Sequence, residues 1–293
     1  MTTLADGQHC PPNLHVCVTS AVSTAPRLRE RVEQKFFITP DRMGQVLALL
    51  RRTCRPDPEF PLDQVNSLYF DSADLEEHAR SDAGDSAKDK IRIRWYGREH
   101  DPHLTDLARS PAPLPVAGVA AGTDAESHQP VQVWLERKTR RGFASTKQRL
   151  AVDVPVSALG FTALGRGIVA PAFLLHTMAG FGFFPVGRLC PVIAISYWRH
   201  RFIEPGNGFR VSLDGHVRSS VVLPGWGRGE RGLELPGAVL EVKGPVFDLP
   251  PALRVLGDLG TSWTRYSKYS SSLDAHAATP GSVSRLWPAG LME

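Results

Sequence analysis

The sequence has few cysteines and no long apolar run, and both absences narrow the classes of protein to consider. Its four cysteines are scattered without a Cys-x-x-Cys pair, so neither a zinc site nor a disulfide framework is indicated, and a cytoplasmic location is expected. The most apolar stretch, residues 171–186, is interrupted by glycines and Pro185 and is too short to span a bilayer. His176 within it is interpreted as a core residue. No basic segment followed by an apolar run opens the chain, so no signal peptide is expected.

Motifs of other phosphate-binding and hydrolytic folds are missing as well. No GxxxxGK[ST] loop is present, so a P-loop nucleotide fold is not supported. No GxSxG motif is present, which argues against an α/β-hydrolase nucleophile. The ten histidines show no spacing typical of metal ligands. Any active site must therefore be built from other residues.

The composition is that of a soluble globular protein with a mild positive charge. The 293 residues are 42% hydrophobic and 22% charged, and the net charge of +4 allows an anionic partner without requiring one. We expect one folded domain over residues 28–275, with a Pro- and Ala-rich surface loop at 100–130. Residues 1–27 and 276–293 are expected to be a loose leader and a loose tail.

The segment from Lys90 to Tyr96 alternates strictly between cationic and apolar side chains, which is the period of a β-strand. Its apolar side chains would face a core, so Lys90, Arg92 and Arg94 would share the opposite face. Three like charges on one face repel one another, and arginine is rarely buried without a partner. Taken alone, the segment is compatible with a solvated sheet face.

Other segments repeat this design and predict the fold. The predicted strands are residues 31–37, 65–71, 90–96, 131–140, 147–153, 192–202, 209–214 and 238–244. Helices are predicted near residues 40–50, 74–80, 171–180 and 248–259, a helical or extended segment from 267, and a Gly-rich loop at 224–237. Strands that are apolar on one face and cationic on the other can close around a charged interior. The predicted fold class is α+β: an antiparallel β-barrel or tunnel of about eight strands with helices packed on the outside.

The charged positions that share a strand face are mostly cationic. These cations are Arg31, Lys35, Lys90, Arg92, Arg94, Lys138, Lys147, Arg149, Arg199, Arg201, Arg210 and Lys243. Cations crowded inside a tunnel destabilise one another unless a multivalent anion neutralises them, and phosphates suit both arginine and lysine. The carboxylates on the same faces are candidate metal ligands: Glu33, Glu136, Asp214 and Glu241. Internal ion pairs with neighbouring cations are the alternative role for these acids.

Two further interpretations concern nucleic acids. A nucleic-acid surface would need its cations outside the barrel, whereas these cations alternate with core residues, so no nucleic-acid partner is predicted. Trp95, Trp134 and Trp198 are interpreted as strand packing rather than as base-stacking residues.

Eight short motifs, in order between about residues 28 and 275, resemble the VTC (vacuolar transporter chaperone) domain of polyphosphate polymerases, within the triphosphate tunnel metalloenzyme (CYTH-like) superfamily. The motifs are Arg31-Val-Glu-Gln-Lys35, Ser67-Leu-Tyr-Phe-Asp71, Lys90-Ile-Arg-Ile-Arg-Trp-Tyr96, Leu135-Glu-Arg-Lys-Thr139, Tyr197-Trp-Arg199, Arg210-Val-Ser-Leu-Asp214, Leu240-Glu-Val-Lys243 and Ser267-Lys-Tyr269. The resemblance implies an antiparallel β-tunnel that binds ATP or another triphosphate with Mn²⁺ or Mg²⁺. It also implies transfer of the terminal phosphoryl group of ATP to a polyphosphate chain.

The resemblance and the strand faces together assign expected roles. Catalysis is expected to depend on Lys35, Arg92, Arg94, Lys138, Arg199 and Arg210. Substrate binding is expected to involve Lys90, Lys147, Arg149, Arg201, Lys243 and Lys268. The resemblance makes Glu241 the expected main metal ligand, with Glu33, Glu136 and Asp214 as further candidates.

One position departs from the superfamily signature Glu-x-Glu-x-Lys, because Arg31 replaces the first acid. Fewer carboxylates argue against a two-metal hydrolase and favour the polymerase branch. The alternatives are a triphosphatase acting on tripolyphosphate, nucleoside or thiamine triphosphate, and a non-catalytic module that binds polyphosphate or inositol polyphosphate. Eukaryotic members sit in a membrane complex, so a separate membrane partner is compatible with the resemblance.

Overall fold

The computed structural model describes residues 23–24, 32–97, 130–142, 144–155, 170–223, 232–259, 261 and 266–278. The strands are β1 (Ser23–Thr24), β2 (Val32–Ile38), β3 (Arg55–Pro56), β4 (Leu62–Asp71), β5 (Ala87–Gly97), β6 (Pro130–Arg141), β7 (Ala144–Pro155), β8 (Cys190–Ile203), β9 (Arg210–Val221) and β10 (Leu233–Gly244). The α-helices are α1 (Met43–Thr53), α2 (Glu76–Asp82), α4 (Pro171–Gly180) and α5 (Lys268–Ala278), with short 3-10 helices at Pro40–Arg42 and Pro251–Leu256.

Ten strands form one antiparallel sheet in the order β1-β7-β6-β5-β4-β8-β9-β10-β2, with β3 paired to β8. Two of them, β1 and β3, are only two residues long, so eight long strands remain, as predicted. Within the described residues no backbone pairing joins β2 to β1 or β7, so the sheet is not a closed barrel. The sheet is nevertheless curled. Lys138 on β6 lies 3.6 Å from Glu33 on β2, although five strands separate β6 from β2 in the sheet.

The sheet has two chemically different faces, as the alternating strands require. On β5 the side chains of Ile91, Ile93 and Trp95 are buried in an apolar cluster, whereas Arg92 and Arg94 contact polar groups on the opposite face. We call the face that carries these arginines the concave face, because the sheet curls around it. The α+β tunnel type of fold predicted from the sequence is confirmed in this curled form.

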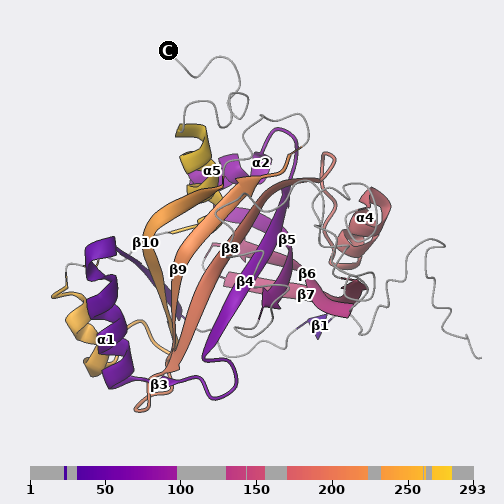
Figure 1. Ribbon diagram of the computed structural model, residues 1–293. Helices are drawn as coiled ribbons and strands as arrows, with labels where there is room; N and C mark the ends of the chain where they lie inside the picture. Colours follow the sequence, from indigo (N-terminus) through magenta and orange to yellow (C-terminus); the bar gives the residue numbers. More distant parts are fainter. Residues whose placement is uncertain are drawn as a thin grey trace, which may run out of the picture.

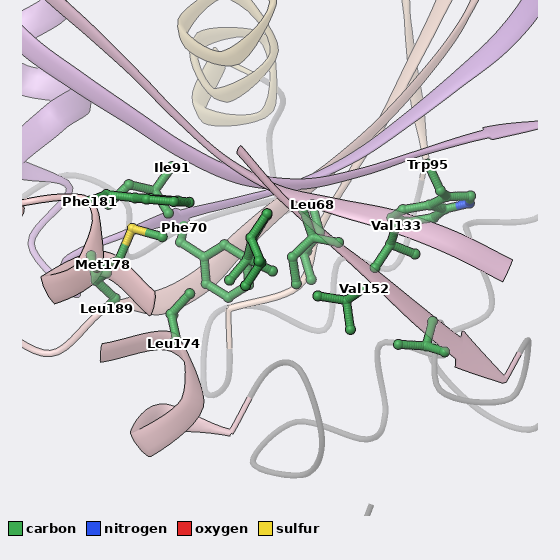
Figure 2. Close-up of a cluster of buried hydrophobic side chains, with 14 of the residues drawn as sticks. Leu68, Phe70, Ile91, Trp95, Val133, Val152, Leu174, Met178, Phe181 and Leu189 are labelled. Carbon is green, nitrogen blue, oxygen red and sulfur yellow. The ribbon is translucent and has the colours of Figure 1, made fainter. Parts of the chain in front are cut away.

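Helices α1 and α4 cover the convex face at its two sides (Figure 1). Leu174 and Met178 of α4 pack with Phe70, Ile91 and other strand residues, as Figure 2 shows. Val46 and Leu50 of α1 pack in a second cluster with residues of β2, β9 and β10. These clusters fix the curvature of the sheet from outside.

Helix α5 departs from the predicted arrangement, because it packs against the concave face. Its Tyr269 and Leu273 join an apolar cluster with Val65 and Ile195, which lie on the inward side of β4 and β8. The ring of Tyr269 stacks on Tyr69 with centroids 5.1 Å apart. One part of the concave face is thus apolar and filled by α5, and α5 lies beside α2 at one end of the molecule (Figure 1).

Several element boundaries differ from the sequence prediction. Strand β10 begins at Leu233, inside the predicted loop, because Gly237 adopts a φ of 77° at a bulge that keeps the strand paired to β9. Strand β1 pairs with β7 although it lies in the expected leader, and α5 continues to Ala278 beyond the expected start of the tail at 276.

Two other predictions concerned His176 in the apolar stretch and the loop at residues 100–130. His176 is exposed, which contradicts its assignment to the core, because α4 is covered on one side only. The predicted loop at 100–130 lies outside the described residues except for Pro130, which opens β6. Among the described residues, no helix is long and apolar enough to cross a membrane.

Candidate functional site

The concave face gathers charged side chains from β2, β5, β6, β7, β8, β9, β10 and the start of α5. The members of this charged face are Glu33, Lys35, Lys90, Arg92, Arg94, Glu136, Lys138, Lys147, Arg199, Asp214, Glu241, Lys243 and Lys268. Among the described residues, nine cations therefore stand against four carboxylates, an excess of five positive charges; Arg31, also predicted on this face, lies outside the described residues. All thirteen were predicted site residues.

The first group of ion pairs is centred on Lys35. Its ammonium lies 3.1 Å from the Glu33 carboxylate and 3.3 Å from that of Glu241. Lys243 binds Glu241 at 2.7 Å, on the neighbouring inward position of β10. Burial opposes the charge on Lys35, but the attraction of Glu241 and Glu33 outweighs it, so the pKa of Lys35 is raised. Burial likewise opposes the charge on Glu241, yet Lys243, Lys35 and Arg199 hold its pKa well below the usual range.

A second group joins β8, β9 and α5. The guanidinium of Arg199 donates two hydrogen bonds of 2.6 Å to the two carboxylate oxygens of Asp214, a bidentate pair. Lys268 binds the same carboxylate at 2.6 Å. Burial opposes ionisation of Asp214, but these two cations lower its pKa. Arg199 also lies 3.7 Å from Glu241, which connects this group to the first.

A third group lies on β5, β6 and β7. Arg92 donates a 2.8 Å hydrogen bond to Glu136, and Lys147 pairs with the other oxygen of that carboxylate. Burial raises the pKa of Glu136, but Arg92, Arg94 and Lys147 together lower it to about 2. Burial lowers the pKa of Lys147 to about 8 against the attraction of Glu136. Glu136 is therefore fixed as an anion between its cations.

Two cations of the charged face contact hydroxyl groups instead. Lys90 donates a 2.6 Å hydrogen bond to the Ser267 hydroxyl, and Arg94 donates to the hydroxyls of Ser67 (3.2 Å) and Tyr197 (3.3 Å). Within the described part of the chain, neither cation pairs with a carboxylate. Burial and repulsion from neighbouring lysines lower the pKa of Lys90 to about 8. These are the cations whose charge is least compensated.

Tyr69 is a polar member of the site that the sequence reasoning missed. Its hydroxyl accepts a 3.0 Å hydrogen bond from Arg92. Burial opposes its ionisation, but Arg92, Arg94 and Lys90 lower the pKa of the phenol to about 7. Ser67, Tyr197 and Ser267 were also missed as contacts, although all of them lie within the family-like motifs. For Ser67 and Tyr197 a signal was available in the sequence, because the alternation along β4 and β8 places both side chains on the concave face.

Within the described residues, three predicted substrate or catalytic cations form no ion pair with the charged face, although Arg149 lies opposite Glu136 and Arg210 opposite Lys243 in the sheet. Arg201 pairs with the buried Asp63 near the start of β4 and donates to the Phe60 carbonyl. Arg149 and Arg210 are exposed and make no ion pair within the described residues. Arg210 is the first residue of β9 and is exposed, which places it at the rim of the concave face.

The four predicted metal ligands differ in their availability. Within the described residues, no group of three acidic, His or Cys side chains could hold a metal ion alone. Magnesium at phosphate sites needs only one or two carboxylates, because phosphate oxygens and water complete its coordination. Glu33 and Glu241 fit that requirement, since both place an oxygen within 3.3 Å of one cationic atom, the Lys35 nitrogen. Asp214 has both oxygens bound by Arg199, and Glu136 belongs to a separate group.

A family model for the VTC domain matches residues 30–106 of the chain. The predicted resemblance to this family is confirmed there. The match contains β2, β4 and β5, and hence the Lys35 and Arg94 positions of the charged face. No curated protein matches the chain.

Several solved structures follow a similar chain path at low similarity. A candidate adenylate cyclase from Bacillus halodurans has 12% identity and a TM-score of 0.42, covering 82% of this chain and 94% of that one. A candidate adenylate cyclase from Vibrio parahaemolyticus has 10% identity and a TM-score of 0.37, with 83% and 97% covered. The Schizosaccharomyces pombe Mediator head module has 11% identity and a TM-score of 0.32, with 84% and 94% covered. Proteins with such different descriptions share this level of similarity, so it points to no activity.

Proposed function

We propose that this protein is a metal-dependent phosphotransferase that moves the terminal phosphoryl group of ATP onto a polyphosphate chain bound against the charged face. The observation that carries the proposal is the excess of five positive charges that the described residues place on one curled face, where Lys90 and Arg94 donate hydrogen bonds to hydroxyl groups and form no ion pair with a described carboxylate. Such an excess is unfavourable in the free protein and favours a multivalent anion. The VTC match over the strands that carry Lys35 and Arg94 supports phosphate as that anion.

The side chains would act by position and charge. Arginine forks grip two phosphate oxygens at once, and lysines add point charges around them. Lys90, Arg92 and Arg94 lie at successive inward positions of β5, and Lys138 lies opposite Lys90 on β6, so these cations can bind one phosphate chain from two strands. Phosphoryl transfer needs mainly positioning and neutralisation of the transferred group, which this arrangement supplies without a covalent nucleophile from the protein.

Glu33 and Glu241 would hold the divalent cation, either Mn²⁺ or Mg²⁺. When bound, the metal would supply neutralisation of phosphate charge. Phosphates that pair with Lys35 and Lys138 would also weaken the hold of these lysines on the two glutamates. Anion and metal binding are therefore expected to strengthen each other.

The acids of the charged face favour transfer to phosphate over transfer to water. A general base works best with a pKa near the working pH. In the unliganded protein all four carboxylates have pKa values lowered by the surrounding cations, and Glu136 lies at about 2, which makes them weak general bases. The terminal oxygen of a polyphosphate chain is already anionic and needs no base. This favours polymerisation over the triphosphatase alternative.

The test is incubation of the purified protein with ATP and Mn²⁺ or Mg²⁺, with the phosphate products separated on a gel. A ladder of polyphosphate with matching release of ADP is expected. If orthophosphate were the sole product, the protein would be a triphosphatase instead. If it bound tripolyphosphate tightly without turnover, it would be a binding module. Lys138→Ala should abolish the ladder, whereas Arg140→Ala, two residues along the same strand and exposed, should retain it.

A further inference from the structure

Two aromatic side chains continue the charged face beyond Arg94. Tyr96 is the next inward residue of β5, and Trp134 lies directly opposite Arg94 on β6. Their rings meet edge to face, with centroids 5.4 Å apart and planes at 72°. Both side chains are half-buried. The cationic strands therefore end in an aromatic surface.

Trp134 is not placed as a core residue would be. Its chain neighbours Val133 and Leu135 are fully buried on the convex face, and Trp95 is buried there with them. Trp134 points to the other face and is half-buried there. Its edge-to-face contact with Tyr96 agrees with the interpretation of Trp134 as packing between β5 and β6. An aromatic ring that is fixed on one edge and open elsewhere is suited to stack on a planar ligand.

Polar groups border the aromatic pair. The guanidinium of Arg201 lies 6.0 Å from the centre of the Tyr96 ring and pairs with the buried Asp63. A second planar cation thus stands beside the rings, with its orientation set by a carboxylate. A planar heterocycle with hydrogen-bonding edges would find both a stacking surface and polar partners here.

We propose that Tyr96 and Trp134 form the nucleobase subsite of the charged face, which makes a nucleoside triphosphate, and not bare tripolyphosphate, the preferred donor. The inference rests on the proposed function, because it places the phosphates at Arg92 and Arg94. Neighbouring strands are about 4.8 Å apart and successive inward residues about 7 Å apart. Trp134 is thus one strand spacing from Arg94, and Tyr96 is one inward step from it, so a nucleotide can reach both parts of the site at once.

The test compares the Kd of ATP with the Kd of tripolyphosphate, each measured by calorimetry on the full chain. Trp134→Ala should raise the Kd of ATP about tenfold, the usual effect of removing one stacking ring, while the Kd of tripolyphosphate stays within about twofold. Trp134→Phe keeps an aromatic face and should recover most of the loss. Tyr96→Leu should act in the same direction as Trp134→Ala. Phe184→Ala removes an exposed aromatic ring elsewhere and should change neither Kd.

The outcomes separate this inference from the proposed function. Equal losses for ATP and tripolyphosphate in Trp134→Ala would show a structural role and overturn the nucleobase subsite. Unchanged affinity for both ligands would overturn it as well. Binding of neither ligand by the unaltered protein would overturn the proposed function itself, and the subsite with it. ATP also should quench tryptophan fluorescence more than tripolyphosphate does, and Trp134→Phe should remove that difference.

Discussion

The ammonium of Lys138 on β6 lies 3.6 Å from the carboxylate of Glu33 on β2, across a sheet in which five strands separate β6 from β2. Within the described residues, β2 and β6 share no backbone hydrogen bond, so this contact between side chains spans the concave face. A phosphate that attracts Lys138 competes directly with Glu33. A phosphate bound to Lys138 would weaken the contact between Lys138 and Glu33, so ligand binding is expected to change the spacing between β6 and β2.

The first prediction concerns the charge of Arg94, which forms no ion pair with a carboxylate of the described residues. Arg94→Met keeps the length of the side chain but removes its charge, so phosphoryl transfer should fall by about 100-fold or more. The unliganded protein should not lose stability, because repulsion among the remaining cations is relieved and the Ser67 and Tyr197 hydroxyls can bind water. Steady-state kinetics and urea unfolding measure the two effects.

Arg80→Met is the matched control for Arg94→Met. Arg80 is an exposed arginine of α2 whose partner is Glu77, away from the charged face. It should retain activity, and the loss of a surface ion pair should change the free energy of unfolding by less than about 1 kcal/mol. Normal turnover in Arg94→Met would remove this residue from the site.

The sequence allowed the faces of the strands to be predicted, because alternation is a local property. Lys90, Arg92 and Arg94 were assigned to one face and lie there, whereas Arg137, at an alternate position of β6, lies on the opposite face and pairs with Asp89. The partner of each acid depends on register between distant strands, which no local pattern encodes. The alternation of side chains also does not show whether a residue lies in the middle of a strand or at its end. Arg210 has the spacing of the residues on the concave face, yet it is exposed at the rim.

The same reasoning explains what was missed about helices and aromatics. The apolar stretch predicted α4 with the correct bounds, but which side of a helix is covered depends on the sheet beneath it, and His176 is exposed. The alternation along the strand shows from the sequence alone that Trp134 lies on the same face as Glu136. The contact between its half-buried side chain and Tyr96 depends on the register of β5 and β6, which the sequence does not show.

Glu241 should serve both metal binding and stability. Glu241→Gln removes the carboxylate shared by Lys35, Lys243 and Arg199, so we expect a loss of about 2 kcal/mol in the free energy of unfolding. Activity should then require a higher concentration of Mn²⁺ or Mg²⁺. A metal titration of activity and urea unfolding measure these changes.

Glu234→Gln is the control on the same strand. Glu234 is exposed on β10 and pairs with His216 and Arg218 outside the charged face. Its replacement should leave the metal titration unchanged. If Glu241→Gln also left that titration unchanged, Glu241 would not be a metal ligand.

The lowered pKa values on the charged face predict opposite effects of pH on stability and on binding. The folded-state pKa values of Lys90 and Lys147 are about 8, and that of Tyr69 is about 7, all below their unfolded values. Between pH 7 and 9 the unfolded chain therefore holds more protons at these groups than the folded chain, so they raise stability as the pH rises. The loss of positive charge should at the same time raise the Kd of tripolyphosphate.

Urea unfolding and calorimetry across pH 7 to 9 would measure these two trends. Binding at pH 8 should take up protons, since the anion favours the charged lysines. Lys90→Arg keeps the charge fixed and should flatten part of the pH dependence of binding. Affinity that does not fall between pH 7 and 9 would contradict the assignment of these lysines to the anion site.

Asp71 should control the position of α5 and, through it, of Lys268. Its carboxylate accepts hydrogen bonds from the backbone N–H groups of Glu77 and His78 in α2 and a 2.7 Å bond from the Tyr269 hydroxyl in α5. Asp71→Asn replaces an acceptor oxygen by a donor, so it should cost about 2–3 kcal/mol of unfolding free energy, whereas Tyr269→Phe removes one bond and should cost about 1 kcal/mol.

Activity distinguishes a positioning role of Asp71 from a purely structural one. Lys268 is the first residue of α5 and binds Asp214 beside Arg199, so a displaced α5 withdraws a cation from the phosphate site. Asp71→Asn should therefore raise the KM for ATP at temperatures where the protein remains folded, and Tyr269→Phe should raise it less. If both variants lost stability in the expected order but kept the KM of the unaltered protein, Lys268 would contribute nothing to substrate binding.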